Sequence, residues 1–181
     1  MEIHRPVPGI PQYLTTATIP PIEKWAGQIA SWIPIYLENY GNASRVHLTS
    51  GFTMYLGRSA QQIYRDLARF YCIDLQGLRI AFLEEMGKSQ YLPLILPNKR
   101  VFCAMKCRKE PQNKNDGVMG YICSTYVQAS NSQPHKQTDI VLKCGSTIRL
   151  HMTQAQIRRR FQEGKKFSIL LSHRHSNEEG C

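Results

Sequence analysis

The stretch IVLKCGSTIRLHMTQAQIRRRF, residues 140–161, has the pattern of a strand, a glycine turn, a second strand and a helix. Ile140 and Leu142 alternate with other residues, and the alternation resumes at Ile148 and Leu150 after an interruption at Gly145. Two short runs of period two around a glycine predict a β-hairpin.

A helix is expected directly after this hairpin. Thr153 is a good N-cap residue because its hydroxyl can accept a hydrogen bond from an amide of the first turn. Ile157 and Phe161 follow with the i, i+4 spacing of an apolar helix face, and we expect them to centre the buried side. Three arginines at 158–160 lie between them and suggest a phosphate-rich partner.

The same pattern occurs earlier in the chain. Residues 46–67, VHLTSGFTMYLGRSAQQIYRDL, align with 140–161 at a constant offset of 94, with seven identities in 22 positions. The identities fall at the turn and on the helix face, and the cap keeps its chemistry, which favours a duplicated unit over chance. Two copies of so long a period predict a β-rich α+β fold of two strand–hairpin–helix units.

These units give the expected domain organisation. Residues 1–24 hold five prolines and form an extended arm, 25–108 form the first unit, and 109–181 form the second, basic unit. The polar stretch 107–116 is the expected boundary. One pseudo-symmetric domain is the alternative to two separate halves.

Further elements follow from local patterns. An apolar segment at 31–40 predicts a strand, in which Pro34 favours an edge or a bulge. The remaining expectations are a strand at 78–83, a hairpin formed by 92–96 and 100–106, a strand at 117–129 and a polar loop at 130–138. The first helix is expected to turn Ile63, Leu67 and Phe70 inward.

The charge is unevenly distributed. The net charge is +10, and residues 1–93 hold eight Lys and Arg against seven Asp and Glu, whereas residues 94–181 hold fifteen against six. Such asymmetry points to a nucleic acid or a membrane surface as partner. No apolar stretch is long enough for a signal peptide or a membrane span, so we expect a cytoplasmic protein without membrane contact.

The sequence contains no clear metal-binding or catalytic motif. Cys103 and Cys107 share a face, but a C-x3-C without a second pair is a weak zinc signal, so we expect free thiols and no metal. There is no P-loop, dinucleotide fingerprint, G-x-S-x-G or H-E-x-x-H. We therefore expect no catalytic residues, no cofactor and no enzymatic activity.

The first unit resembles the LytTR DNA-binding domain of bacterial regulators. The stretch IPIYLENYGNASRVHLTSGFTMYLGRSAQQIYRDL carries its opening pattern of strand, polar loop, hairpin and Ser-capped helix. FYCIDLQGLRIAFLEEM and LPLILPNKRVFCAMKC occupy the places of later strands of that domain. The resemblance implies duplex DNA binding.

About residues 60–160 also resemble the ComK family of competence transcription factors. The landmarks follow in the family's order, namely Arg69-Phe70-Tyr71, Gly77, Pro93-Leu94-Ile95-Leu96, Gly120-Tyr121-Ile122, and the hairpin at 140–150 with Thr153. The resemblance implies a bacterial, sequence-selective regulator of transcription that binds paired AT-rich boxes through the minor groove as a homo-oligomer.

The basic residues of the second half are the candidate DNA-binding residues, because Lys and Arg supply the sequence-independent part of DNA affinity. For any one of them the alternative is a solvated surface charge. The candidates are Lys99, Arg100, Lys106, Arg108, Lys109, Lys143, Arg149, Arg158, Arg159, Arg160, Lys165 and Lys166. At about 100° per residue, Arg159 should lie opposite the core with Arg158 and Arg160 on its flanks.

Two other functions remain open. A protein-interaction adaptor or antagonist built on a regulator fold is the main alternative, and it implies a regulatory protein partner. RNA binding is less favoured because the basic half lacks an aromatic stacking motif of the RRM type.

Overall fold

The computed structural model describes residues 3–4, 19–37 and 41–178, so most of the predicted N-terminal arm lies outside the described residues. The described chain has a mixed α+β fold with two sheets, confirming the predicted class. Sheet A has six antiparallel strands. A short additional strand, β1 (Ile3–His4), pairs with β2 in the parallel direction. In spatial order its strands are β4 (Thr53–Leu56), β3 (Gly41–Leu48), β2 (Ile29–Leu37), β7 (Met119–Cys123), β6 (Val101–Lys106) and β5 (Leu94–Ile95).

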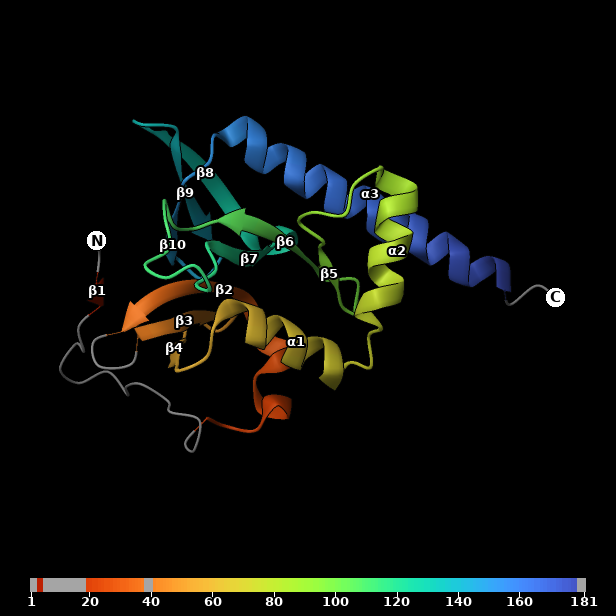
Figure 1. The fold of residues 1–181 in the computed structure, drawn as a ribbon, viewed down its shortest axis with the longest axis horizontal. Coiled ribbons are helices and arrows are strands. Elements are labelled where there is room, and N and C mark those ends of the chain that lie inside the picture. The colour runs from red at the N-terminus through yellow and green to blue at the C-terminus, as the bar shows by residue number, and fades with distance from the viewer. Residues whose placement is uncertain (1–2, 5–18, 38–40, 179–181) are drawn as a thin grey trace.

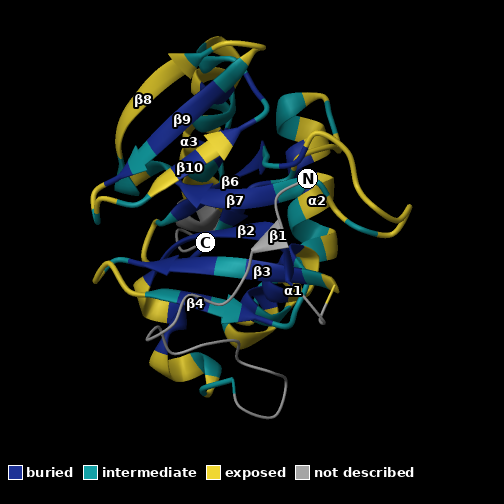
Figure 2. Ribbon diagram, turned by 90° about the vertical axis from the view of Figure 1, so that its left-hand side faces the viewer, coloured by how far each residue is buried: buried dark blue, intermediate teal, exposed yellow. Residues whose placement is uncertain are grey.

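Sheet B packs over one face of sheet A, and α1 (Ala60–Phe70) packs over the other (Figure 1). Sheet B consists of β10 (Thr147–Leu150), β9 (Gln137–Leu142) and β8 (Val127–Gln133). All nine residues of β2 are buried because this central strand is covered on both faces (Figure 2). Sheet A therefore lies between two hydrophobic clusters, one on each of its faces.

Each cluster joins residues that are distant in sequence. Under α1, Trp32, Tyr64 and Tyr121 pack together, with ring centroids 4.9 Å apart in the Trp32–Tyr121 and Tyr64–Tyr121 pairs. On the opposite face, Ile122 of sheet A packs in one cluster with Ile140 of sheet B.

All three predicted hairpins are present, including the one that pairs β5 with β6, and two of them belong to the repeated pattern. The turn between β3 and β4 contains Gly51 at φ 90°, and the turn between β9 and β10 contains Gly145 at φ 85°. A left-handed φ of this kind favours glycine, which lacks the Cβ that would clash. The glycines therefore fix both turns, as the pattern predicted.

Both predicted helix starts are also present. Ser59 and Gln62 form a capping box at the start of α1. At the start of α3 (Gln154–Glu178), the Gln156 amide donates to the Thr153 hydroxyl over 3.3 Å. The expected inward face of α1 is only partly right, because Phe70 is exposed and Tyr64 is buried instead.

The strand predicted at 78–83 is wrong, because these residues belong to the helix α2 (Leu75–Met86). The Asp74 carboxylate accepts a 2.9 Å hydrogen bond from the Gln76 amide at its start. Gly87, at φ 66°, ends it in the left-handed conformation. A short apolar run fits either a strand or a helix, and these end signals decide between them.

The strand predicted at 117–129 and the loop predicted at 130–138 are each only partly right. A 3₁₀ turn at Ser124–Tyr126 divides the segment, so that β7 joins sheet A and β8 joins sheet B. Residues of the expected loop extend β8 and begin β9. Most of β8 is exposed (Figure 2), and an edge strand with both faces in water shows no apolar alternation.

Pro34 lies in an interior strand rather than at the predicted edge. It pairs with Ser44 of β3, whereas on its other side β2 pairs with β7 at 31–32 and with β1 at 36–37. Pro34 falls between these two pairings, where its missing N–H breaks no ladder hydrogen bond.

The polar stretch 107–116 connects β6 to β7, which are hydrogen-bonded neighbours in sheet A. Sheet A therefore contains strands from both sides of the expected boundary between residues 108 and 109.

Candidate nucleic-acid interface

The helix α3 is held against sheet A and α2 through small and aromatic residues. A Cβ on Gly164 would lie 2.6 Å from Cys103 Sγ and 3.0 Å from Val101 Cγ1, so the helix backbone touches β6 directly. Farther along, Phe167 packs edge-on against Phe82 of α2, with ring centroids 4.9 Å apart. The described part of the chain contains no helix long and apolar enough to span a membrane.

These contacts rotate α3 relative to the orientation expected from sequence. Ile157 is buried as predicted, but Phe161 is only half-buried, and Gly164 and Phe167 are the other buried positions between residues 154 and 174. Because the buried face lies closer to Gly164 than to Phe161, Arg158 turns outward and Arg160 turns toward the protein. Arg160 is half-buried, and its guanidinium lies 3.5 Å from the centroid of the Tyr91 ring.

The outward side of α3 carries four exposed cations, which we call the α3 basic face: Arg158, Arg159, Lys165 and Lys166. Eight residues of α-helix separate its ends, or about 12 Å. Arg159 donates to Glu163 over 2.9 Å. Within the described ranges, the other three form no ion pair, and the exposed side chains of residues 154–174 include no carboxylate.

Glu163 lies beside this face, and its carboxylate is paired with two cations. Its carboxylate contacts Lys88 Nζ at 2.5 Å and Arg159 Nε at 2.9 Å. Burial alone would raise the pKa of Glu163, but the hydrogen bonds from Lys88 and Arg159 outweigh it and lower the pKa. The carboxylate thus stays ionised. Because Lys88 shares it with Arg159, Glu163 offsets only part of the positive charge of the α3 basic face.

A second group of predicted residues lines two hollows. Lys106 and Arg160 line a hollow of about 910 Å³ between α3 and the loop after α2. Lys109 and Arg149 line another of about 610 Å³, and His151 lines both. Burial lowers the pKa of His151, and the charges of Lys106, Lys109 and Arg149 lower it further.

Arg149 also has a structural partner. Its guanidinium donates to both carboxylate oxygens of Asp139, over 2.8 Å and 2.9 Å. The Arg149 hydrogen bond lowers the pKa of Asp139. Lys143 lies with its ammonium 5.9 Å from the centroid of the Tyr126 ring, and Lys99 is exposed in the turn between β5 and β6.

The candidate Arg108 is buried and unsuited to phosphate contact. Its guanidinium stacks 3.9 Å from the centroid of the Tyr36 ring and donates to Gly117 O over 3.1 Å and to Asn42 Oδ1 over 3.0 Å. Burial is the main reason that the pKa of Arg108 is lowered. This side chain anchors the 107–116 stretch to sheet A.

Arg100 has a similar structural role. It donates to Gly27 O over 2.6 Å and lies 5.2 Å from the centroid of the Phe102 ring. The sequence pattern could not distinguish Arg100 and Arg108 from exposed arginines, because each is next to a lysine in a polar stretch.

Lys88 and Tyr91 were missed by the sequence analysis. They lie in the loop between α2 and β5 and line the larger hollow with Arg160. Tyr91 is 42% exposed and has φ 62°, which is unfavourable for a bulky residue. Nothing in the local sequence signals this conformation.

Among the described residues, no group of three or more His, Cys, Asp and Glu is placed to hold a metal ion. Burial raises the pKa of both Cys103 and Cys107 to about 12, so these thiols stay protonated at neutral pH.

No family model, curated protein or solved structure matches this chain.

Proposed function

We propose that the protein binds double-stranded DNA through the α3 basic face and regulates transcription in the cytoplasm as a homo-oligomer of the ComK type. The observation that carries this proposal is the set of four exposed cations on one side of one long helix, of which only Arg159 is paired with a carboxylate among the described residues. Phosphate contacts of this kind release condensed counterions and supply affinity for any duplex. Sequence selectivity for AT-rich boxes then requires fewer, additional contacts to base edges or to groove shape.

The proposal extends to an internal duplication of the β2–β3–β4–α1 and β8–β9–β10–α3 units. One hydrogen bond from a buried side chain recurs at the offset of 94: the Ser44 hydroxyl donates to Arg58 O over 2.7 Å, and the Thr138 hydroxyl donates to Met152 O over 2.8 Å. The strand registers recur as well. In the first hairpin the paired residues are 44↔56, 45↔55, 46↔54 and 47↔53. In the second hairpin the equivalent pairs are 138↔150, 139↔149, 140↔148 and 141↔147. Only the second unit carries the basic helix face.

Two charge-matched triple variants test the DNA-binding face. The first changes Arg158, Lys165 and Lys166 to Gln, and the second changes Lys24, Lys114 and Lys136 to Gln. All six side chains are exposed, and each variant loses the same charge. Binding of a fluorescent AT-rich duplex is measured by anisotropy over a series of salt concentrations.

We expect the α3 variant to bind every duplex more weakly and to lower the slope of log K against log salt by roughly two to three units, about 0.9 for each lost phosphate contact. The control variant should keep a slope close to that of the wild type. Equal losses in both variants would show that the α3 basic face is not the binding surface.

A protein-interaction role is the second candidate, and one observation favours it. Ile80 and Leu83 of α2 are 52% and 50% exposed and lie three residues apart on the same side of the helix. If the wild-type protein fails to bind any duplex at low salt, this role replaces the DNA-binding proposal.

A further inference from the structure

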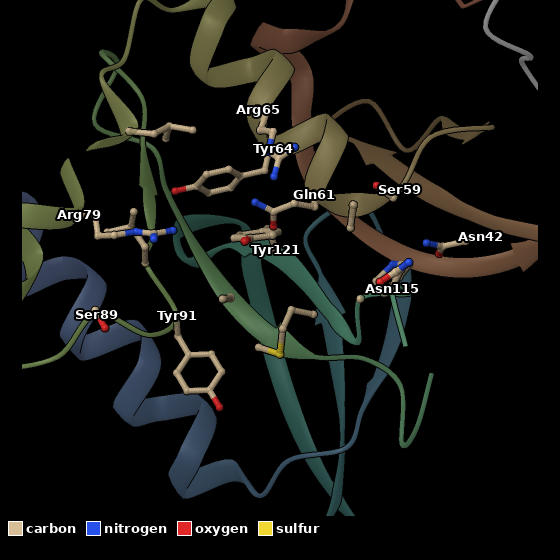
Figure 3. Close-up of a pocket in the computed structure, with 17 residues that line it drawn as sticks. Asn42, Ser59, Gln61, Tyr64, Arg65, Arg79, Ser89, Tyr91, Asn115 and Tyr121 are labelled. Carbon is tan, nitrogen blue, oxygen red and sulfur yellow. The ribbon is translucent and has the colours of Figure 1, made fainter. Parts of the chain in front are cut away.

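A separate cavity of about 440 Å³ lies on the α1 side of sheet A, and we call it the tyrosine cavity (Figure 3). Tyr64 and Arg65 reach it from α1, Arg79 reaches it from α2, and Tyr121 of β7 lies at its floor. Its volume is within the range of small-molecule sites, about 300–1,000 Å³. A duplex does not fit into a space of this size.

The charged residues that line the cavity are all positive. Arg65 and Arg79 both line it, and its lining contains no Asp or Glu. Neither arginine forms an ion pair within the part of the chain that the structure describes. The N-terminus of α1, an 11-residue helix, also opens here through Ala60 and Gln61, and its partial positive charge adds to that of the arginines.

The Tyr64 hydroxyl supplies a second and independent indication of a ligand. Tyr64 is only 3% exposed, and its hydroxyl has no hydrogen-bond partner among the described residues. A buried polar group without a partner costs about 1–3 kcal/mol, so such groups call for an explanation. Figure 3 shows this hydroxyl pointing toward the side from which Arg79 enters, and the charge of Arg79 acts on the Tyr64 phenol.

The lining also includes polar, uncharged side chains and an apolar part. Leu75, Leu92, Ala104 and Met119 line the cavity together with the ring of Tyr121. The Tyr121 ring is held in place because it stacks on Trp32 and packs against Tyr64. A ligand that fits therefore combines an anionic group with an apolar body.

We propose that the tyrosine cavity binds a small organic anion, a carboxylate or a phosphate monoester, whose charged group lies between Arg79, Arg65 and the Tyr64 hydroxyl. The apolar part of the ligand packs on Leu75 and Leu92 and meets the edge of the Tyr121 ring. This site is distinct from the α3 basic face, and the proposal holds whether or not the protein binds DNA.

Phenyl phosphate is a suitable probe, with phenol as its neutral counterpart and inorganic phosphate as the anion without an apolar body. Each is titrated into the ¹⁵N-labelled protein and followed by amide chemical shifts. We expect saturable binding of phenyl phosphate with a Kd of about 1 mM, as for a ligand of this size, and shifts at cavity residues. Phenol and inorganic phosphate should each bind at least about tenfold more weakly, since each lacks one half of the recognition.

Three variants assign the effect to the cavity. Arg79→Gln should weaken phenyl phosphate binding about tenfold or more, because it removes a charged hydrogen bond. Tyr64→Phe should weaken binding severalfold without loss of thermal stability, because the hydroxyl it removes has no described partner. Arg69→Gln changes an exposed arginine of α1 outside the cavity lining and should bind as the wild type does.

Three results would overturn the proposal: no saturable binding of phenyl phosphate up to about 20 mM, well above the Kd expected for its size; equal binding of phenol or inorganic phosphate; or wild-type affinity in both Arg79→Gln and Tyr64→Phe. None of these results bears on duplex binding by the α3 basic face, so the two proposals fail separately.

Discussion

At the scale of single residues, His47 shows how burial of a titratable side chain makes the stability of the fold depend on pH. It is 3% exposed in β3, and its Nδ1 lies 2.8 Å from the Ser31 hydroxyl. Burial, with a smaller contribution from the charge of Arg45, lowers the pKa of His47 from 6.5 to about 3. His47 therefore stays neutral in the folded protein while it is protonated in the unfolded chain below pH 6.5.

This difference gives stability a defined sign with pH. Between pH 6.5 and 3 the unfolded state binds more protons at this site, so acid favours unfolding. Lowering the pH from 6.5 to 5 should cost about 2 kcal/mol of the free energy of unfolding through His47. Urea unfolding at pH 7 and pH 5 measures it, and His47→Gln should lose that part of the difference. An unchanged difference in the variant would assign the pH dependence to other groups.

Gly120 and Gly117 form a natural pair for testing the close packing of β7 on β2. A Cβ on Gly120 would lie 2.7 Å from Cys107 Sγ and 2.9 Å from the Trp32 carbonyl oxygen, whereas a Cβ on Gly117 meets no atom within 4 Å. Gly120→Ala should lower the free energy of unfolding by about 1–3 kcal/mol, because the backbone of β2 must move. Gly117→Ala should stay within about 0.5 kcal/mol of the wild type. Thermal unfolding compares them, and equal melting temperatures would contradict the close contact.

At the scale of elements, the α3 arginines differ in role although they are adjacent in sequence. Arg158 is exposed without a described ion pair, whereas Arg160 is half-buried against the Tyr91 ring. Arg158→Gln should weaken duplex binding severalfold with little change in melting temperature. Arg160→Gln should lower the free energy of unfolding by about 0.5–2 kcal/mol through the lost cation–π contact and change DNA affinity less. The reverse pattern would show that α3 is oriented differently.

The sequence predicted those elements that carry several local signals in agreement. Gly145, the alternation around it and the Thr153 cap together predict one hairpin and one helix, and both are present. The 75–86 helix was missed because its apolar run is short and Gly77 weakens the helix pattern. β8 was missed because an exposed edge strand of uncharged polar residues resembles a loop.

The candidate site was predictable in composition but not in geometry. The excess of Lys and Arg in the second half is visible in the sequence, but burial of Arg108 depends on Tyr36 and Asn42, more than 60 residues away. The rotation of α3 depends likewise on Gly164 meeting Cys103 of a strand from the first half. Long-range packing of this kind leaves no local pattern.

At the scale of the whole molecule, the two halves share one sheet and one core. β7, which follows the polar stretch 107–116, pairs with β6 and with β2, both of which precede it. In the cluster between the sheets, Val101 and Ile33 of sheet A pack with Leu142 and Leu150 of sheet B. Neither half can therefore bury its apolar face without the other.

We accordingly predict that the chain cut between residues 108 and 109 does not yield two stable domains. Fragment 1–108 would leave the β2 and β6 edges unpaired where β7 binds, and fragment 109–181 would expose the inner face of sheet B to water. Each fragment alone should melt without a cooperative transition by circular dichroism, while the intact chain melts in a single transition. Mixing the fragments should restore part of the cooperative signal, because the missing strand and core face are then supplied in trans. Cooperative melting of either isolated fragment would instead show that the two units are independent domains.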